Sequence, residues 1–175
     1  EKFWVIAHPF IASKALRISD RAKEVTQEES GKGVLDHYGN GGKLDAFRHA
    51  FWMATLGHAV NPRKAINLGK AHERGNERDF KKHRTEEGEI PDLIAVEMDL
   101  WNNQIGISIA KSNPDAVEEE IRKRVKERIK NGNCKIIKKG NQGNFLSEDN
   151  ELITDEEWKG KWINKRCLVK SNYSY

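Results

Sequence analysis

The sequence predicts a mainly α-helical protein: a single compact helical domain of about five helices with a small C-terminal appendage of loops and short strands. Three observations predict this fold class. Apolar residues recur every three or four positions, the segments that carry them are separated by Asn-Pro or Asn-Gly breaks, and this pattern fades after residue 131. A chain of 175 residues is also large enough for a core of its own. We therefore expect one domain over 1–175, with a helical core over 1–131 and an irregular appendage over 132–175.

The first half of the chain predicts three helices. Apolar residues at helical spacing mark the first helix over residues 10–25, and a glycine-rich loop follows over 30–42. A second helix is expected over 44–59, because Pro62 blocks its continuation. Pro62 then suits the first turn of a third helix, which carries His72.

The middle of the chain changes from a charged stretch to the strongest helical pattern. Residues 74–88 are almost wholly charged, with Phe80 as the only large apolar residue, so we expect a solvated loop or flap there. Residues 92–111 then predict a helix with an apolar stripe that we expect to be buried. That stripe comprises Ile94, Met98, Trp101, Ile105 and Ile109. A second stripe has small residues around two polar ones and comprises Ala95, Asp99, Asn102, Gly106 and Ala110.

The C-terminal part predicts a charged helix followed by shorter elements. The helix is expected over 115–130, with a narrow buried seam of Val117, Ile121, Val125 and Ile129. We expect a short strand over 134–138 and a last short helix over 155–165. Cys134 and Cys167 are either two ordinary thiols or one disulfide, and neither has a neighbouring cysteine at metal-binding spacing.

Composition bounds the classes of partner. The chain is 37% hydrophobic and 33% charged, with no apolar run of the roughly 18 residues needed to span a bilayer. Its net charge of +4 and pI near 9.0 favour polyanions such as nucleic acid, anionic lipid headgroups or cell-wall polymers. Because 27 acidic residues accompany 31 basic ones, binding by simple charge is permitted but not required.

Three predicted helices each carry titratable residues on a face of small residues, and we expect these faces to form one polar site. The second helix carries Arg48 and His49, with Asp45, His49 and Trp52 along one face. The third helix carries His72 and Glu73, and the fourth carries Asp99. Histidines and carboxylates are the side chains that acid–base catalysis or a divalent metal ion requires.

The candidate site therefore has named roles for each residue. The predicted catalytic residues are Arg48, His49, His72, Glu73 and Asp99, and the predicted substrate-binding residues are His8, Trp52, Asn102 and Asn103. If a divalent metal ion is bound, its expected ligands are His49, His72 and Asp99. The alternative is structural, in which Arg48–Asp99 or His49–Glu73 pairs hold the helices together.

Several enzyme classes lack their motifs. No second histidine stands four residues after His72, which disfavours a zinc metalloprotease. The sequence also has no Gly-x-Ser-x-Gly nucleophile elbow and no phosphate-binding glycine loop before a Lys-Ser/Thr pair.

The order of the motifs resembles a family of bacterial domains found in secreted and polymorphic-toxin-like proteins. The matching motifs are His-Pro at 8–9, Asp-Ala-Phe-Arg-His-Ala-Phe-Trp at 45–52, Ala-His-Glu at 71–73 and Asp-Leu-Trp-Asn-Asn-Gln-Ile-Gly at 99–106. The resemblance covers roughly residues 4–111. It implies a toxin or effector that is secreted or delivered into a target bacterium, with the periplasm as one place of action and a cognate immunity protein as a partner, but it does not imply a reaction.

The expected function is a hydrolase, metal-dependent or acid–base, that acts on a phosphodiester substrate such as phospholipid or nucleic acid. Arg48 is expected to stabilise anionic charge in the transition state. A cell-wall glycan hydrolase using Glu73 and Asp99 is an alternative, since paired carboxylates perform that chemistry. A binding domain whose polar motifs are structural is the other alternative. A pore-forming toxin has little support, because no segment has the apolar length.

Overall fold

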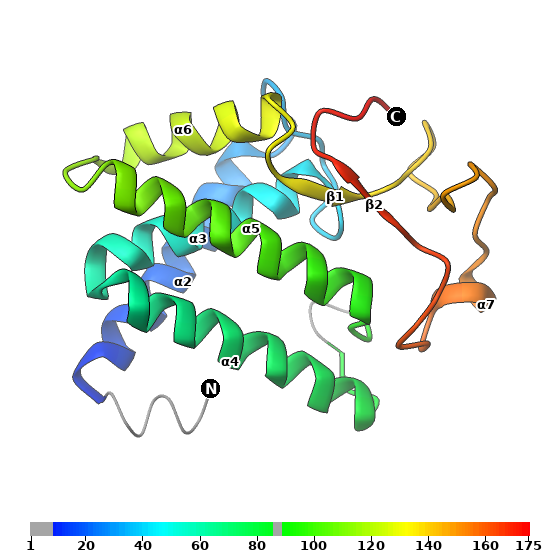
Figure 1. The fold of residues 1–175 in the computed structure, drawn as a ribbon, viewed down its shortest axis with the longest axis horizontal. Coiled ribbons are helices and arrows are strands. Elements are labelled where there is room, and N and C mark those ends of the chain that lie inside the picture. The colour runs from blue at the N-terminus through cyan, green and yellow to red at the C-terminus, as the bar shows by residue number, and fades with distance from the viewer. Residues whose placement is uncertain (1–8, 86–88) are drawn as a thin grey trace.

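The fold is mainly helical, as the sequence predicts, with a two-stranded sheet near the C-terminus (Figure 1). The computed structural model describes residues 9–85 and 89–175, so His8 lies outside the described residues. The helices are α2 (Pro9–Glu29), α3 (Lys43–Val60), α4 (Pro62–Lys81), α5 (Leu93–Ser112), α6 (Glu118–Lys130) and the short α7 (Asp155–Trp158). The strands are β1 (Lys135–Ile137) and β2 (Leu168–Lys170). Within the described residues, none of the helices has the length and apolar content needed to cross a membrane.

Helix α3 is the centre of the molecule. It has completely buried Phe47 and Phe51, whose rings stack 5.6 Å apart, and the core around them includes residues of α2, α5, α6 and β1. Helix α5 approaches α3 most closely at Gly106, where a methyl group would lie 2.2 Å from the carbonyl oxygen of Ala50. The two helices can touch this closely only because position 106 has no side chain.

Only part of the predicted apolar stripe of α5 is buried: Met98 and Ile109 are buried, but Trp101 is not. The small-residue stripe faces the core, with Asn102 completely buried, whereas Trp101 of the apolar stripe is 46% exposed and donates its Nε1–H to Asn133. The prediction of a buried Trp101 was wrong, because the close approach at Gly106 turns the small residues toward α3. Val117, predicted in the buried seam of the next helix, is also exposed.

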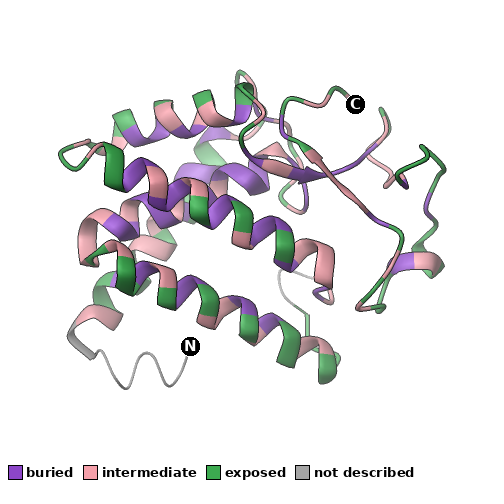
Figure 2. Cartoon of the chain, viewed as in Figure 1, coloured by how far each residue is buried: buried purple, intermediate pink, exposed green. Residues whose placement is uncertain are grey.

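Helix α4 continues through a segment that was predicted to be a loop. Residues 74–81 are helical, and Asn76 is buried among them while most of their charged side chains are exposed. Buried and exposed positions alternate along α4 (Figure 2). An ion pair four residues apart, Glu77–Lys81, supports the last turn, and Phe80 packs against Trp162. Composition alone hid this helix, because only a narrow stripe of it is buried.

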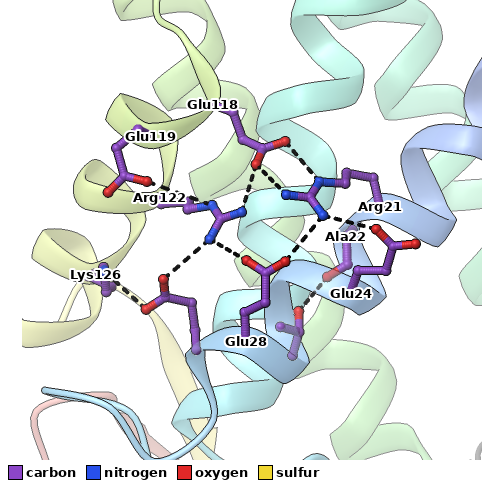
Figure 3. Close-up of polar contacts among 10 residues, drawn as sticks. Arg21, Ala22, Glu24, Glu28, Glu118, Glu119, Arg122 and Lys126 are labelled. Carbon is purple, nitrogen blue, oxygen red and sulfur yellow. Dashed lines mark hydrogen bonds and ion pairs between the residues drawn. The ribbon is translucent and has the colours of Figure 1, made fainter.

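A network of ion pairs joins α2 to α6 (Figure 3). The carboxylate of Glu118 lies between two guanidinium groups, 2.9 Å from Arg21 and 2.7 Å from Arg122. Arg122 also reaches Glu28 at 2.7 Å, so the charged surfaces of the two helices are held together beside the apolar contacts beneath them.

The C-terminal segment packs on the helices through its sheet. Strands β1 and β2 pair antiparallel, with Ile136 opposite Val169. The side chain of Asn102 donates to the carbonyl of Lys135 at 2.9 Å and accepts its N–H at 3.0 Å, which fastens β1 to α5. Helix α7 ends at Trp158, earlier than the predicted 165, and Gly160 follows with φ +68°. Neither Cys134 nor Cys167 forms a disulfide.

Candidate functional site

Three side chains from α3 and α5 meet at one point. Asp45 and His49 are four residues apart on α3 and therefore share a face, and Asp99 approaches them from α5. The Nε2 atom of His49 lies 3.2 Å from an oxygen of Asp99 and 3.5 Å from an oxygen of Asp45. All three residues are buried. We call Asp45, His49 and Asp99 the His49 cluster.

Arg48 and the preceding loop hold the His49 cluster in place. The guanidinium of Arg48 donates to Asp45 at 2.6 Å and lies 3.1 Å from Nε2 of His49, and the other oxygen of Asp45 accepts the N–H of Gly41 at 2.7 Å. Burial opposes ionisation of Asp45, but Arg48 and His49 outweigh it, so the pKa of this carboxyl lies below its ordinary value. Asp45 is therefore a carboxylate at neutral pH.

A polar cleft opens beside the His49 cluster. Its charged and polar lining residues are Asn40, Asp45, Arg48, Glu89, Asp99 and Arg166. The volume is about 30 Å³, which is enough for a water molecule or a metal ion. We call this hollow the polar cleft. A larger substrate would place only its reacting group inside.

The C-terminal segment supplies a buried arginine to the polar cleft. Two nitrogens of Arg166, Nε and Nη2, donate hydrogen bonds to Asp92. The guanidinium also contacts the rings of Phe145 and Trp158, 4.5 Å and 4.1 Å from their centroids. Its third nitrogen, Nη1, is buried and has no hydrogen-bond partner among the described residues. Because the nitrogens that contact Asp92 are Nε and Nη2, Nη1 is the one left for another partner.

A lysine buttresses the same wall. The ammonium of Lys139 donates a hydrogen bond to the carbonyl oxygen of Asn40 at 2.6 Å, and the side-chain amide of Asn40 donates one to the carboxylate of Glu89 at 2.6 Å. Burial lowers the pKa of Lys139 to about 8.

The predicted site residues divide into two groups. Arg48, His49 and Asp99 come together, as described above. His72 is half-buried, packs edge-on against Trp52 with 5.7 Å between ring centroids, and is not part of the His49 cluster. Glu73 is buried, accepts a hydrogen bond from Asn76 at 3.2 Å, and lines a separate groove between α4 and α5.

The two predicted asparagines differ in their surroundings. Asn102 binds the backbone of β1 and is part of the framework. Asn103 is buried beside a small cavity lined by Met53 and Gly69, and neither atom of its amide has a partner among the described residues. A buried amide of this kind needs a water molecule or a ligand group.

The residues that lie close enough to share a metal ion differ from the expected ligands. Among the described residues, the group whose ligand atoms all lie within 4.8 Å of one another is Asp45, His49 and Asp99, without His72. Asp45 shares a helix face with His49, so spacing alone could have found it. Arg166 and Lys139 carry no signal in the sequence, because they reach the site only through the folding of the C-terminal segment.

Comparison with known proteins gives a family but no function. A family model described as a domain of unknown function (DUF6973) matches residues 2–133. No curated protein and no solved structure matches the chain. The matched region includes the His49 cluster and Arg48, whereas Arg166 and Lys139 lie beyond it.

Proposed function

Because this chain belongs to the DUF6973 family of domains of unknown function, we propose its function from its own residues: a hydrolase that cleaves a phosphodiester bond at the polar cleft. One observation carries the proposal. A buried imidazole lies 3.2 Å from a carboxylate in the wall of a cleft that two arginines also line. This combination provides a proton acceptor beside groups that stabilise negative charge.

The roles of the residues follow from their chemistry. Asp99 lines the cleft and accepts the proton of the attacking water, and His49, buried behind it at 3.2 Å, shares that proton with the carboxylate. Arg48 and Arg166 line the cleft and neutralise the charge that develops on the phosphoryl oxygens. The basic pI near 9.0 favours the approach of a polyanion such as nucleic acid or an anionic phospholipid surface.

Two other functions have weaker support. A glycan hydrolase needs Glu73 and Asp99 on either side of one substrate, but Glu73 lines the α4–α5 groove and Asp99 lines the polar cleft. A purely structural role explains Asn102 well. It does not explain why the buried Nη1 of Arg166, a residue that lines the cleft, has no partner within 9–85 and 89–175.

Purified protein tests the reaction directly. We expect it to hydrolyse at least one phosphodiester among single-stranded and duplex nucleic acids and phospholipid vesicles, and we expect His49→Ala to lose that activity by at least about 100-fold. His58→Ala is the matched control, because His58 lies on the same helix, contacts the carbonyl of Ala110 and is outside the His49 cluster. Equal activity of wild type and His49→Ala would refute the proposal.

The toxin context is part of the proposal and has its own test. We propose that the protein is secreted or delivered into a target bacterium, where a cognate immunity protein protects the producer. Expression directed to the cytoplasm or to the periplasm, with and without His49→Ala, distinguishes nucleic acid from envelope substrates by the compartment in which growth stops. Unimpaired growth in both compartments would contradict a toxin that acts on bacteria.

A further inference from the structure

The contacts of His49 conflict with one another when only protein atoms are considered. If Nε2 carries a proton, its charge suits the carboxylate oxygen of Asp99 3.2 Å away, but it faces the N–H of Arg48 at 3.1 Å, donor against donor. If Nε2 carries a lone pair, it accepts from Arg48 but faces two carboxylate oxygens at 3.2 and 3.5 Å. Neither protonation state satisfies all three contacts.

A cation at this point removes the conflict. We infer that Asp45, His49 and Asp99 bind a divalent metal ion, with Nε2 and one oxygen of each carboxylate as ligands. Two ligand atoms about 2.1 Å from one ion, at roughly 90–110° to each other, lie roughly 3.0–3.5 Å apart. The observed separations of 3.2 and 3.5 Å agree with that spacing. One imidazole and two carboxylates, without a thiolate, suit Mn²⁺, Mg²⁺ or Zn²⁺.

The polar cleft supplies a second, independent observation. It is lined by three carboxylates (Asp45, Glu89 and Asp99) but only two guanidinium groups, and one of those, Arg166, is already paired with Asp92. With Lys139 in the same wall and Asp92 beside Arg166, four carboxylates face three cations, and the remaining negative charge favours a bound cation. The buried Nη1 of Arg166 has no partner among the described residues, and it can donate to a water molecule or phosphate oxygen bound to the metal.

Arg48 competes with the ion. Its guanidinium is 2.6 Å from the oxygen of Asp45 that would bind the metal, so metal binding requires the arginine to share that oxygen or to move away. Replacing Arg48 by the uncharged methionine removes this competing charge. Metal affinity should then increase, whereas an arginine that only stabilises the cluster would leave it unchanged or lower it.

Metal binding does not rest on the proposed function, but the role of the metal in hydrolysis does. With the ion bound, His49 would serve as a ligand, and activation of the attacking water would fall to the ion rather than to the His49–Asp99 pair. Calorimetry of the metal-stripped full chain with Mn²⁺ alone should give one site per chain. Asp45→Asn, His49→Ala and Asp99→Asn should each weaken it by at least about tenfold, since even loss of a group that only orients a ligand costs roughly 10–100-fold. Glu97→Gln is the matched control, because Glu97 is exposed on the same helix as Asp99.

Each outcome is decisive. Mn²⁺ binding weakened in the three cluster variants, unchanged in Glu97→Gln and tighter in Arg48→Met supports the site. Absence of binding to wild type, or binding unchanged in Asp99→Asn of intact circular dichroism, overturns it. If Mn²⁺ does not bind and the metal-stripped protein still cleaves a phosphodiester, the metal site is refuted and the proposed function stands. If Mn²⁺ binds but no phosphodiester is cleaved, the metal site stands and the proposed function fails.

Discussion

Replacing Gly106 by alanine places a methyl group where α3 and α5 touch most closely. Its Cβ would lie 2.2 Å from the carbonyl oxygen of Ala50, 2.9 Å from the backbone nitrogen of Ala54 and 2.9 Å from Cβ of Met53. An ordinary C···O contact is about 3.3–3.6 Å, so the helices must separate by about 1 Å. No side-chain rotation relieves the clash, because two of these atoms belong to the backbone.

The size of the effect follows from two opposing terms. Overpacking a core costs about 1–3 kcal/mol, and the upper end applies where the obstacle is backbone. Alanine gains up to about 1 kcal/mol over glycine from helix propensity. We therefore expect Gly106→Ala to lower the free energy of unfolding by about 1–2 kcal/mol and, because α5 carries Asp99, to reduce hydrolysis and Mn²⁺ affinity as well.

A matched variant isolates the contact from helix propensity. Gly75 lies in α4 with nothing within 4 Å of its added Cβ, so Gly75→Ala should raise the free energy of unfolding by about 0.5–1 kcal/mol. Urea denaturation of both variants and wild type measures the difference. The reasoning is refuted if Gly106→Ala is as stable as Gly75→Ala.

Three further predictions concern the framework. Asn102→Ala removes two hydrogen bonds to the backbone of Lys135 and should lower the free energy of unfolding, measured by urea denaturation, by about 2–4 kcal/mol. An unchanged free energy of unfolding would mean that other contacts alone hold β1. Hydrogen bonds from arginines lower the pKa values of Glu28 and Glu118 below 4.5. The stability that these carboxylates contribute is therefore present above pH 4.5 and is lost as pH falls through their lower pKa values in the folded state. The melting temperature should drop in this range, and the drop should be smaller in high salt because salt screens the ion pairs. A drop that does not depend on salt would contradict this cause. Burial lowers the pKa of Lys139 from 10.5 to about 8, so the unfolded chain binds more protons than the folded one between these pH values. The free energy of unfolding should therefore rise with pH across this range in wild type and rise less in Lys139→Met. Equal slopes of the free energy of unfolding against pH in the two proteins would contradict this prediction.

Local signals explain why most of the helices could be predicted. Pro62 marks the boundary between α3 and α4, and Asp92 caps α5 by accepting the N–H of Ala95 at 2.9 Å. The prediction of a loop over 74–81 was wrong because a helix with a narrow buried stripe has nearly the composition of a loop. The prediction of a buried Trp101 was wrong because hydrophobicity does not reveal which face of α5 a neighbouring helix approaches. That choice depends on Gly106.

The candidate site was predictable only as far as its helices. Arg48, His49 and Asp99 are on segments whose spacing places them on polar faces, and Asp45 lies one turn before His49. His72 shares the same kind of motif but points its ring at Trp52. Arg166 could not be assigned, because its place depends on the β1–β2 pairing and on two aromatic rings far along the chain.

The most direct test of the central claim is the rate of phosphodiester hydrolysis by Asp99→Asn. This substitution keeps the size of the side chain and removes the negative charge that His49 contacts at 3.2 Å. We predict that the variant keeps the circular dichroism spectrum of wild type and loses hydrolysis by at least about 100-fold. A well-folded Asp99→Asn that cleaves the same substrate at the wild-type rate would contradict the proposed function.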